Sequence, residues 1–224
     1  MAVKKSAKHA KTAEKQKKAT KNNTDHVLKY KGVKAFKSTH PDIKKLRRQN
    51  EAPSIHGNKI WDSSYVLMDF LRRWPPGDDL TIMDIGCGWG VLSSYLAKQF
   101  DANVIGLDAD EAVQPYFDYH AQENNVDLAF SVGTMKSIKK SALSDIDVLV
   151  GADICFWPEL GSDWKKLIKR ALDAGVEQIY IADPGRSPFW DLVKHCEKKF
   201  DGQVWSHDIK KPFESEKYIL EIVV

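Results

Sequence analysis

Five short apolar runs, separated by segments with helical periodicity, dominate the sequence from residue 60 onward. The runs are Leu80–Ile85, Asn103–Leu107, Leu128–Val132, Ile146–Val150 and Gln178–Ala182. Between the later runs, apolar residues recur at the spacing of one helix face. The clearest such face comprises Trp164, Leu167, Ile168 and Ala171. Short strands that alternate with helices predict an α/β fold with a parallel, doubly wound sheet.

The C-terminal end of the sequence departs from this alternation. Two extended runs, Gln203–Ile209 and Tyr218–Val224, are joined by a polar loop that contains Pro212, with no helical segment between them. They predict a hairpin, and therefore an antiparallel strand on an otherwise parallel sheet. A dinucleotide-binding domain would instead continue with a sixth parallel strand. We therefore expect a Rossmann-like, doubly wound, mostly parallel sheet of seven strands with a C-terminal antiparallel hairpin.

Charge is distributed unevenly along the 224 residues. Residues 1–50 hold 16 Lys and Arg against 3 Asp and Glu, a net charge of +13, whereas the rest of the chain holds 18 basic and 28 acidic residues, a net charge of −10. The Lys-rich beginning has too few apolar side chains to form a core. We expect a disordered basic tail at 1–26, a basic extension at 27–56 and one folded domain at 57–224.

The composition argues against several classes of protein. No apolar run approaches the ~18 residues of a membrane helix, and the N-terminus lacks the apolar segment of a secretory signal. The cysteines, Cys87, Cys155 and Cys196, show no CxxC spacing, and the histidines show no metal-binding spacing. We expect a cytoplasmic protein with no membrane association and no metal site, whose cysteines are inert packing residues.

A glycine-rich turn directly follows the first apolar run. It reads Asp84-Ile-Gly-Cys-Gly-Trp-Gly90, so Gly86, Gly88 and Gly90 have the spacing GxGxG. Nicotinamide dinucleotide sites have GxGxxG instead. Glycines allow the backbone to bend sharply and to approach a ligand closely. A strand that passes through this turn into a helix predicts a cofactor site of the nucleotide-binding kind.

An acidic residue, Asp108, follows the second apolar run, 18 residues beyond Gly90. In dinucleotide folds, a carboxylate at this place accepts hydrogen bonds from the ribose hydroxyls. Asp110 is the competing candidate, although it could instead cap the next helix. The position at the strand end favours Asp108.

These motifs resemble those of class I (seven-β-strand) methyltransferases that use S-adenosylmethionine. Further motifs narrow the resemblance to the methyltransferase-16 group of protein lysine methyltransferases. They are Ile60-Trp61-Asp62 on a helix before the first strand, Gly151-Ala-Asp-Ile-Cys-Phe156 after the fourth strand and Ala182-Asp-Pro-Gly-Arg186 after the fifth. The last looks most like the branch that acts on the electron transfer flavoprotein β-subunit. The resemblance covers about residues 57–224. Where the group has Asp-x-x-Tyr, this chain has Asp153-Ile-Cys-Phe156, which keeps the aromatic ring but lacks the hydroxyl.

The resemblance implies that S-adenosylmethionine is the cofactor. Its binding residues would be Trp61, Asp84, Gly86, Gly88, Gly90, Asp108, Thr134, Met135, Gly151 and Ala152. Trp61 would cover the cofactor from the helix before the first strand, and Thr134 and Met135 would lie near the adenine. The motifs after the strands fall at carboxyl ends, where open α/β sheets bind their ligands.

The resemblance also implies direct, in-line transfer of the methyl group to a protein lysine. The enzyme would align the nucleophile and exclude water, and no covalent enzyme intermediate would be needed. Asp153 would orient the acceptor amine, in a channel formed by Phe156 and Trp157. Desolvation between aromatic walls would lower the pKa of the acceptor lysine. Arg186 could either bind an acidic group of the substrate or pair with a carboxylate of the domain.

Two other acceptors remain open. A small molecule, methylated on nitrogen as nicotinamide-like compounds are, would require a closed pocket instead of a peptide groove. An RNA acceptor could be recruited by the basic tail through phosphate contacts, although the tail has few aromatic side chains for base stacking. A tail of this kind can also attract an acidic partner. The expected partners are therefore a protein or small-molecule acceptor, with an acidic partner or nucleic acid at the tail.

Overall fold

A computed structural model describes residues 26–54 and 56–224, and the structural statements below concern these residues. The disordered tail predicted for residues 1–26 therefore lies outside the described residues, apart from its last position. Among the described residues, no helix combines the length and the apolar character that crossing a bilayer requires.

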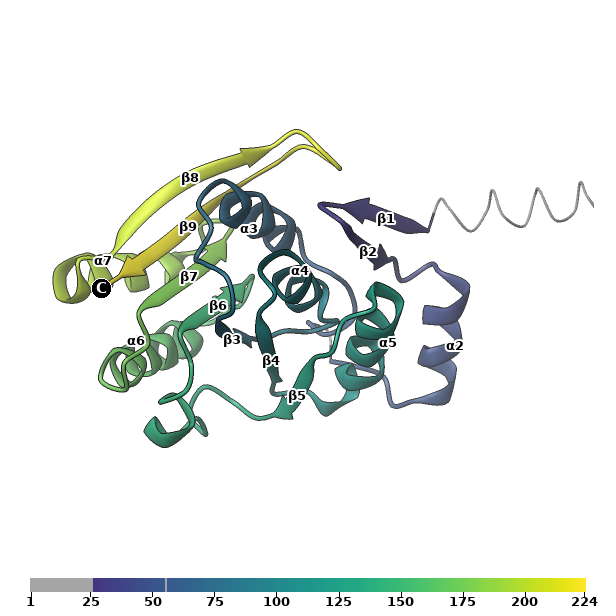
Figure 1. The fold of residues 1–224 in the computed structure, drawn as a ribbon, viewed down its shortest axis with the longest axis horizontal. Coiled ribbons are helices and arrows are strands. Elements are labelled where there is room, and N and C mark those ends of the chain that lie inside the picture. Colours follow the sequence, from purple (N-terminus) through teal and green to yellow (C-terminus); the bar gives the residue numbers. More distant parts are fainter. Residues whose placement is uncertain (1–25, 55) are drawn as a thin grey trace, which may run out of the picture.

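A seven-stranded sheet forms the centre of the fold (Figure 1). Its strands are β3 (Thr81–Ile85), β4 (Asn103–Asp108), β5 (Ala129–Val132), β6 (Val148–Ala152), β7 (Gln178–Asp183), β8 (Gln203–Ile209) and β9 (Ser215–Val223). Their order across the sheet is β5-β4-β3-β6-β7-β9-β8. The first five strands are parallel, and β9 runs antiparallel to both β7 and β8. The predicted mostly parallel sheet with a C-terminal hairpin is confirmed.

Helices cover both faces of this sheet. They are α3 (Asp62–Arg73), α4 (Val91–Phe100), α5 (Gln114–Asn124), α6 (Pro158–Leu172) and α7 (Ser187–Phe200), with the 3₁₀ turns η1 (Glu111–Val113) and η2 (Lys140–Ala142). Neighbouring strand residues point to opposite faces. Ile82 accordingly joins the core under α3 and α4, whereas Met83 joins the core under α6 and α7. Because β6 and β7 are covered on both faces, they are almost continuously apolar.

The N-terminal extension packs against the outer helices of the domain. It forms a hairpin, β1 (Val27–Tyr30) and β2 (Val33–Phe36), followed by α2 (Pro41–Gln49). The Phe36 N–H donates to His120 Nε2 at 3.1 Å, and Phe36 shares a buried cluster with Ile43, Trp89 and Tyr116. The extension therefore belongs to the same folded body as the sheet.

A buried carboxylate, Asp69 on α3, joins this hairpin to the C-terminal hairpin. Its oxygens lie 2.6 Å from Lys31 Nζ and 3.0 Å from His207 Nε2, and they accept the Tyr30 hydroxyl at 3.1 Å. Burial alone would raise the pKa of Asp69, but these hydrogen bonds lower it to about 2.

Candidate active site

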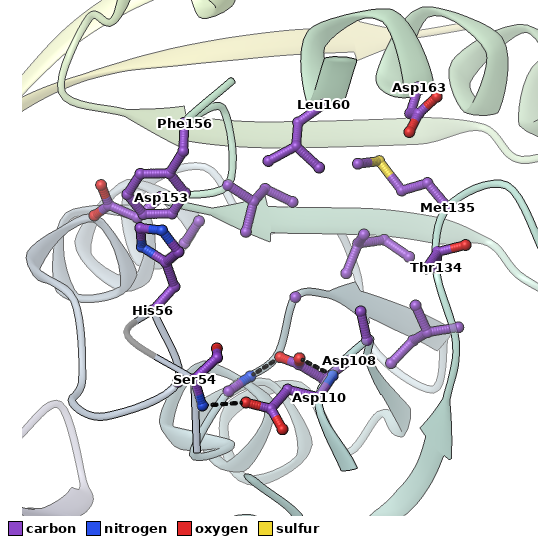
Figure 2. Close-up of a pocket in the computed structure, with 18 of the residues that line it drawn as sticks. Ser54, His56, Asp108, Asp110, Thr134, Met135, Asp153, Phe156, Leu160 and Asp163 are labelled. Atoms are coloured by element: carbon purple, nitrogen blue, oxygen red, sulfur yellow. Dashed lines mark hydrogen bonds between the residues drawn. The ribbon is translucent and has the colours of Figure 1, made fainter. Parts of the chain in front are cut away.

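A cavity of about 590 Å³ lies at the carboxyl ends of β3, β4 and β6 (Figure 2). The strand order reverses at β3, which pairs with β4 on one side and with β6 on the other. Ligands of open α/β sheets bind at such a switch point. The volume falls within the range of small-molecule sites, ~300–1,000 Å³.

The three glycines of the turn after β3 all have positive φ angles, 69° at Gly86, 51° at Gly88 and 70° at Gly90. They serve different purposes. A Cβ on Gly88 would meet no heavy atom within 4 Å, so its position opens onto the cavity that it lines. A Cβ on Gly90 would lie 2.6 Å from the Phe117 ring. Gly88 therefore leaves space for a ligand in the cavity. Gly90 does not face the cavity, and its lack of a side chain lets the Phe117 ring of α5 pack against the turn.

Two other predicted cofactor residues also lie behind the cavity wall. Asp84 is buried and accepts the Ser93 hydroxyl at 2.6 Å, and its burial raises its pKa to about 7. A Cβ on Gly151 would lie 2.7 Å from the Trp164 ring, so this glycine allows α6 to approach the sheet. Asp84, Gly90 and Gly151 thus support the shape of the site and are not among the residues that line it.

Asp108 and Asp110 both line the cavity but have different partners. Asp108 Oδ2 accepts the Gly88 N–H and Asp108 Oδ1 accepts the Asp110 N–H, each at 2.9 Å. Burial raises the pKa of Asp108. Asp110 accepts the Ala112 N–H at the start of η1 and the Ser54 N–H. The two carboxylates therefore have different structural roles. Asp108 joins the glycine turn to the end of β4, and Asp110 caps η1.

The linker between α2 and α3 borders the cavity, and apart from Trp61 its lining residues were not predicted. Ser54, His56, Gly57 and Lys59 line the site from this linker. Trp89 Nε1 donates to the Gly57 carbonyl at 2.8 Å. Residues 50–59 of this linker have neither apolar periodicity nor a motif, so no sequence pattern identified them.

Trp61 lines the cavity from the end of this linker. We expected it on a helix, but it is the N-cap residue of α3, which begins at Asp62. Its indole donates to the His56 carbonyl at 2.9 Å and therefore stabilises the linker.

An aromatic cluster occupies one end of the cavity and comprises His56, Trp61, Phe156 and Trp157. The ring centroids of His56 and Phe156 are 4.2 Å apart, those of Trp61 and Phe156 are 5.3 Å apart, and those of His56 and Trp157 are 5.8 Å apart. Trp157 is 56% exposed, so the cluster reaches the surface. In Figure 2, Thr134 and Met135 lie on the opposite side of the cavity from His56 and Phe156.

Asp153 lies beside this cluster, buried and with φ of 60°. Its Oδ1 accepts Arg186 Nη2 at 2.8 Å, and its Oδ2 accepts the Ser63 N–H at 3.1 Å. Arg186 also donates to Asp183 at 2.7 Å and lies 4.2 Å from the centroid of the Phe156 ring. Of the two roles considered for Arg186, the structure shows the pairing with carboxylates.

The cavity suits the chemical groups of S-adenosylmethionine. The Asp108 carboxylate lines the cavity and has the acceptor oxygens that ribose hydroxyls require, and the open position at Gly88 leaves room for a ligand beside the backbone. Apolar side chains from several strands surround this space. The predicted cofactor residues that line it are Trp61, Gly86, Gly88, Asp108, Thr134, Met135 and Ala152. In the described ranges, no group of three or more His, Cys, Asp or Glu could hold a metal ion.

Comparisons with known proteins agree with this geometry. Residues 82–175 match the sequence profile of the family described as "Methyltransferase domain". A ubiquinone biosynthesis O-methyltransferase from Bartonella tribocorum is 29% identical over 79 residues, which cover 35% of this chain and 31% of that protein. The chain thus matches about a third of that enzyme's length.

Solved structures share the fold at low sequence identity. A methyltransferase from Pyrococcus furiosus has a TM-score of 0.59 and 17% identity, covering 81% of this chain and 92% of its own. TrmK of M. capricolum, solved with S-adenosyl-homocysteine, has a TM-score of 0.52 and 11% identity, covering 70% of this chain and 67% of its own.

None of these matches is specific to protein lysine methyltransferases, so they support the broader part of the predicted resemblance. The strand order, the cavity at the switch point and the matched profile all point to the same class and cofactor. The chain carries a class I, S-adenosylmethionine-dependent methyltransferase domain.

Proposed function

We propose that the protein transfers a methyl group from S-adenosylmethionine directly to the Nζ atom of a lysine side chain in a protein. The observation that carries this proposal is the aromatic cluster beside the buried Asp153, at one end of the cavity. The cofactor, when bound, supplies an electrophilic methyl group.

The aromatic cluster suits an amine that must lose a proton. An ammonium group is attracted to the faces of aromatic rings, and its transfer from water to an apolar channel lowers its pKa. The neutral amine is the form with a free lone pair for in-line attack. Because Trp157 is exposed, the channel opens at the surface, where the side chain of a folded protein can enter.

Asp153 has the geometry of an orienting group. The Arg186 guanidinium and the Ser63 N–H each occupy one lone pair of its carboxylate, which fixes its orientation. Each oxygen retains a second lone pair that can accept a hydrogen bond from the acceptor nitrogen. In this proposal Asp153 and Phe156 contact the acceptor, and Arg186 acts by positioning both of them.

A small-molecule acceptor is the second candidate. It is favoured by the names of the curated relatives, which are ubiquinone biosynthesis O-methyltransferases. In this candidate the His56 imidazole, which lines the cavity, would take the proton of an acceptor hydroxyl.

Labelled S-adenosylmethionine distinguishes the two candidates. We expect that incubation of the purified protein with this cofactor and a cell lysate labels the protein fraction, and that acid hydrolysis releases the label as methyl-lysine. Label in the small-molecule fraction would support the second candidate, and label in RNA would contradict both.

The proposed role of Asp153 has a matched control. Asp153→Asn should lower turnover at least about tenfold, or ~1.4 kcal/mol in activation free energy, with cofactor affinity retained. Asp145→Asn, at an exposed position outside the cavity, should leave turnover unchanged. Equal turnover in the two variants would refute the role of Asp153.

A further inference from the structure

A second cavity, of about 220 Å³, adjoins the first on the other side of Trp61 and Asp153. It is lined by Lys59, Trp61, Asp62, Asp153, Pro184, Arg186 and Lys217. Lys59, Trp61 and Asp153 also line the larger cavity, so the two spaces share a wall. We call this space the Lys59–Lys217 pocket.

Arg186 contributes little free positive charge to this pocket. Its guanidinium forms salt bridges with Asp153 and Asp183, at 2.8 and 2.7 Å, and both carboxylates are buried. Two carboxylates therefore engage this one guanidinium and leave a net charge of −1 in the wall when both are ionised. The guanidinium also lies on the Phe156 ring.

Unlike Arg186, the two lysines of the pocket form no ion pair with a described carboxylate. The Lys59 ammonium lies 3.9 Å from the centroid of the Trp61 ring, and the Lys217 ammonium donates to the Ser215 hydroxyl at 2.9 Å. Among the described residues, neither ammonium has a carboxylate within 4.0 Å. Asp62 is the other acidic side chain of this wall, and no described cation pairs with it. The two lysines offset Asp62 and the charge left by the Arg186 group, but neither ammonium is held in an ion pair with a described carboxylate.

We propose that the Lys59–Lys217 pocket binds the carboxylate of an acidic residue that flanks the acceptor lysine in the protein substrate. The inference rests on the proposed lysine acceptor and adds a sequence preference to it. Consecutive residues of an extended chain are ~3.3–3.6 Å apart. A neighbour one or two positions from the acceptor can therefore reach across the shared wall while the acceptor side chain lies in the aromatic cluster.

The same arrangement would discriminate between substrates. An acidic neighbour gains an ion pair with Lys59 or Lys217 and displaces the weaker contacts that these ammonium groups now make. A basic neighbour would meet two like charges, which selects against it.

Peptide binding measured without turnover tests the proposal. Two short fluorescein-labelled peptides carry a single Lys, flanked by Glu in one and by Gln in the other. Their affinities are measured by fluorescence anisotropy with the full chain and saturating S-adenosyl-homocysteine. We expect the Glu peptide to bind about three- to fivefold more tightly, the strength of a partly exposed ion pair, and this preference should decline as salt concentration rises.

Variants of Lys217 and Lys59 assign the preference to the pocket. Lys217→Gln and Lys59→Gln should each reduce it, Lys217→Arg should retain it, and Lys217→Glu should favour a Lys-flanked peptide. Lys194→Gln, on the exposed side of α7, is the control for loss of one positive charge and should retain the full preference. Calorimetry with S-adenosyl-homocysteine checks that each variant is folded.

Equal binding of the two peptides by the wild-type chain, no binding of either, or a preference unchanged in both Gln variants would overturn the proposal. Methylation of both peptides without a preference would leave the lysine acceptor standing and refute only the pocket. A pocket-dependent binding preference without methylation of either peptide would support the anion site and count against the lysine acceptor.

Discussion

The open position at Gly88 gives the sharpest test of the glycine turn. Gly88→Ala adds one methyl group, which would meet no protein atom within 4 Å and would point into the cavity. The Gly88 N–H would still donate to Asp108, since the backbone amide is unchanged. The substitution therefore changes the space available to a ligand more than it changes the packing of the protein.

Two separate costs follow from this geometry. The φ of 51° places an alanine in the left-handed region, which costs ~1–2 kcal/mol of folding stability. A methyl group forced against a bound ligand costs a further ~1–3 kcal/mol of binding free energy by overpacking. That cost corresponds to a cofactor dissociation constant raised about five- to 150-fold.

Gly175→Ala is the matched control. Gly175 also has a positive φ, 105°, with no heavy atom within 4 Å of its missing Cβ. It precedes β7, at the amino ends of the parallel strands, whereas the cavity lies at their carboxyl ends. This variant should lose at least as much stability in chemical denaturation and should bind S-adenosylmethionine like the wild type in calorimetry. If Gly88→Ala also binds with wild-type affinity, the turn does not approach the cofactor and the reasoning fails.

Three further substitutions test the supporting structure of the site. Arg186→Leu leaves the Asp153 carboxylate buried without its cation. The free energy of unfolding, measured in guanidinium chloride, should therefore fall by ~3–5 kcal/mol. A loss below ~1 kcal/mol would show that the pair is unimportant for stability. Burial raises the folded-state pKa of Asp84 to about 7 from 3.8, so the stability that its proton contributes is present below about pH 4 and is lost as pH rises through about 7. Asp84→Asn should flatten this decline in urea titrations at several pH values, and an unchanged slope would contradict the assignment. Trp89→Phe removes the hydrogen bond to the Gly57 carbonyl, which holds the linker against the cavity. The substitution should lower the free energy of unfolding by ~1 kcal/mol and weaken cofactor binding. Unchanged cofactor affinity in calorimetry would mean that the linker does not close the site.

The central strands of the sheet could be predicted from the sequence because each is a compact, mostly apolar run. The predicted runs Asn103–Leu107 and Gln178–Ala182 differ from β4 and β7 by one residue at the C-terminal end. The predicted strand Gln203–Ile209 coincides with β8. Burial on both faces imposes an apolar composition on central strands such as β7. β8 is an edge strand with mostly exposed residues, and its extended run was recognised from the absence of a helix before β9.

Most of the predicted cofactor residues do line the cavity, and they could be predicted because they lie at strand ends. Gly88 and Asp108 are joined by a hydrogen bond across two neighbouring parallel strands, which any doubly wound sheet would bring together. The sequence did not separate the glycine that faces the cavity from Gly90, whose lack of a Cβ serves helix packing.

The aromatic end of the cavity depends on contacts between distant segments, and these have no local signature. Asp153 meets Arg186, 33 residues further along the chain, and Ser63, 90 residues before it. His56 reaches the Phe156 ring from a linker without periodicity. Sequence patterns indicated two roles for Arg186, and only the folded arrangement shows which carboxylates it contacts.

The cofactor itself provides the most direct measurement. Isothermal titration calorimetry of the purified chain should show binding of S-adenosylmethionine and of its demethylated product, and no heat with NAD, because the cavity combines a GxGxG turn with the Asp108 carboxylate. Binding of NAD without binding of either sulfur compound would contradict the account at its centre.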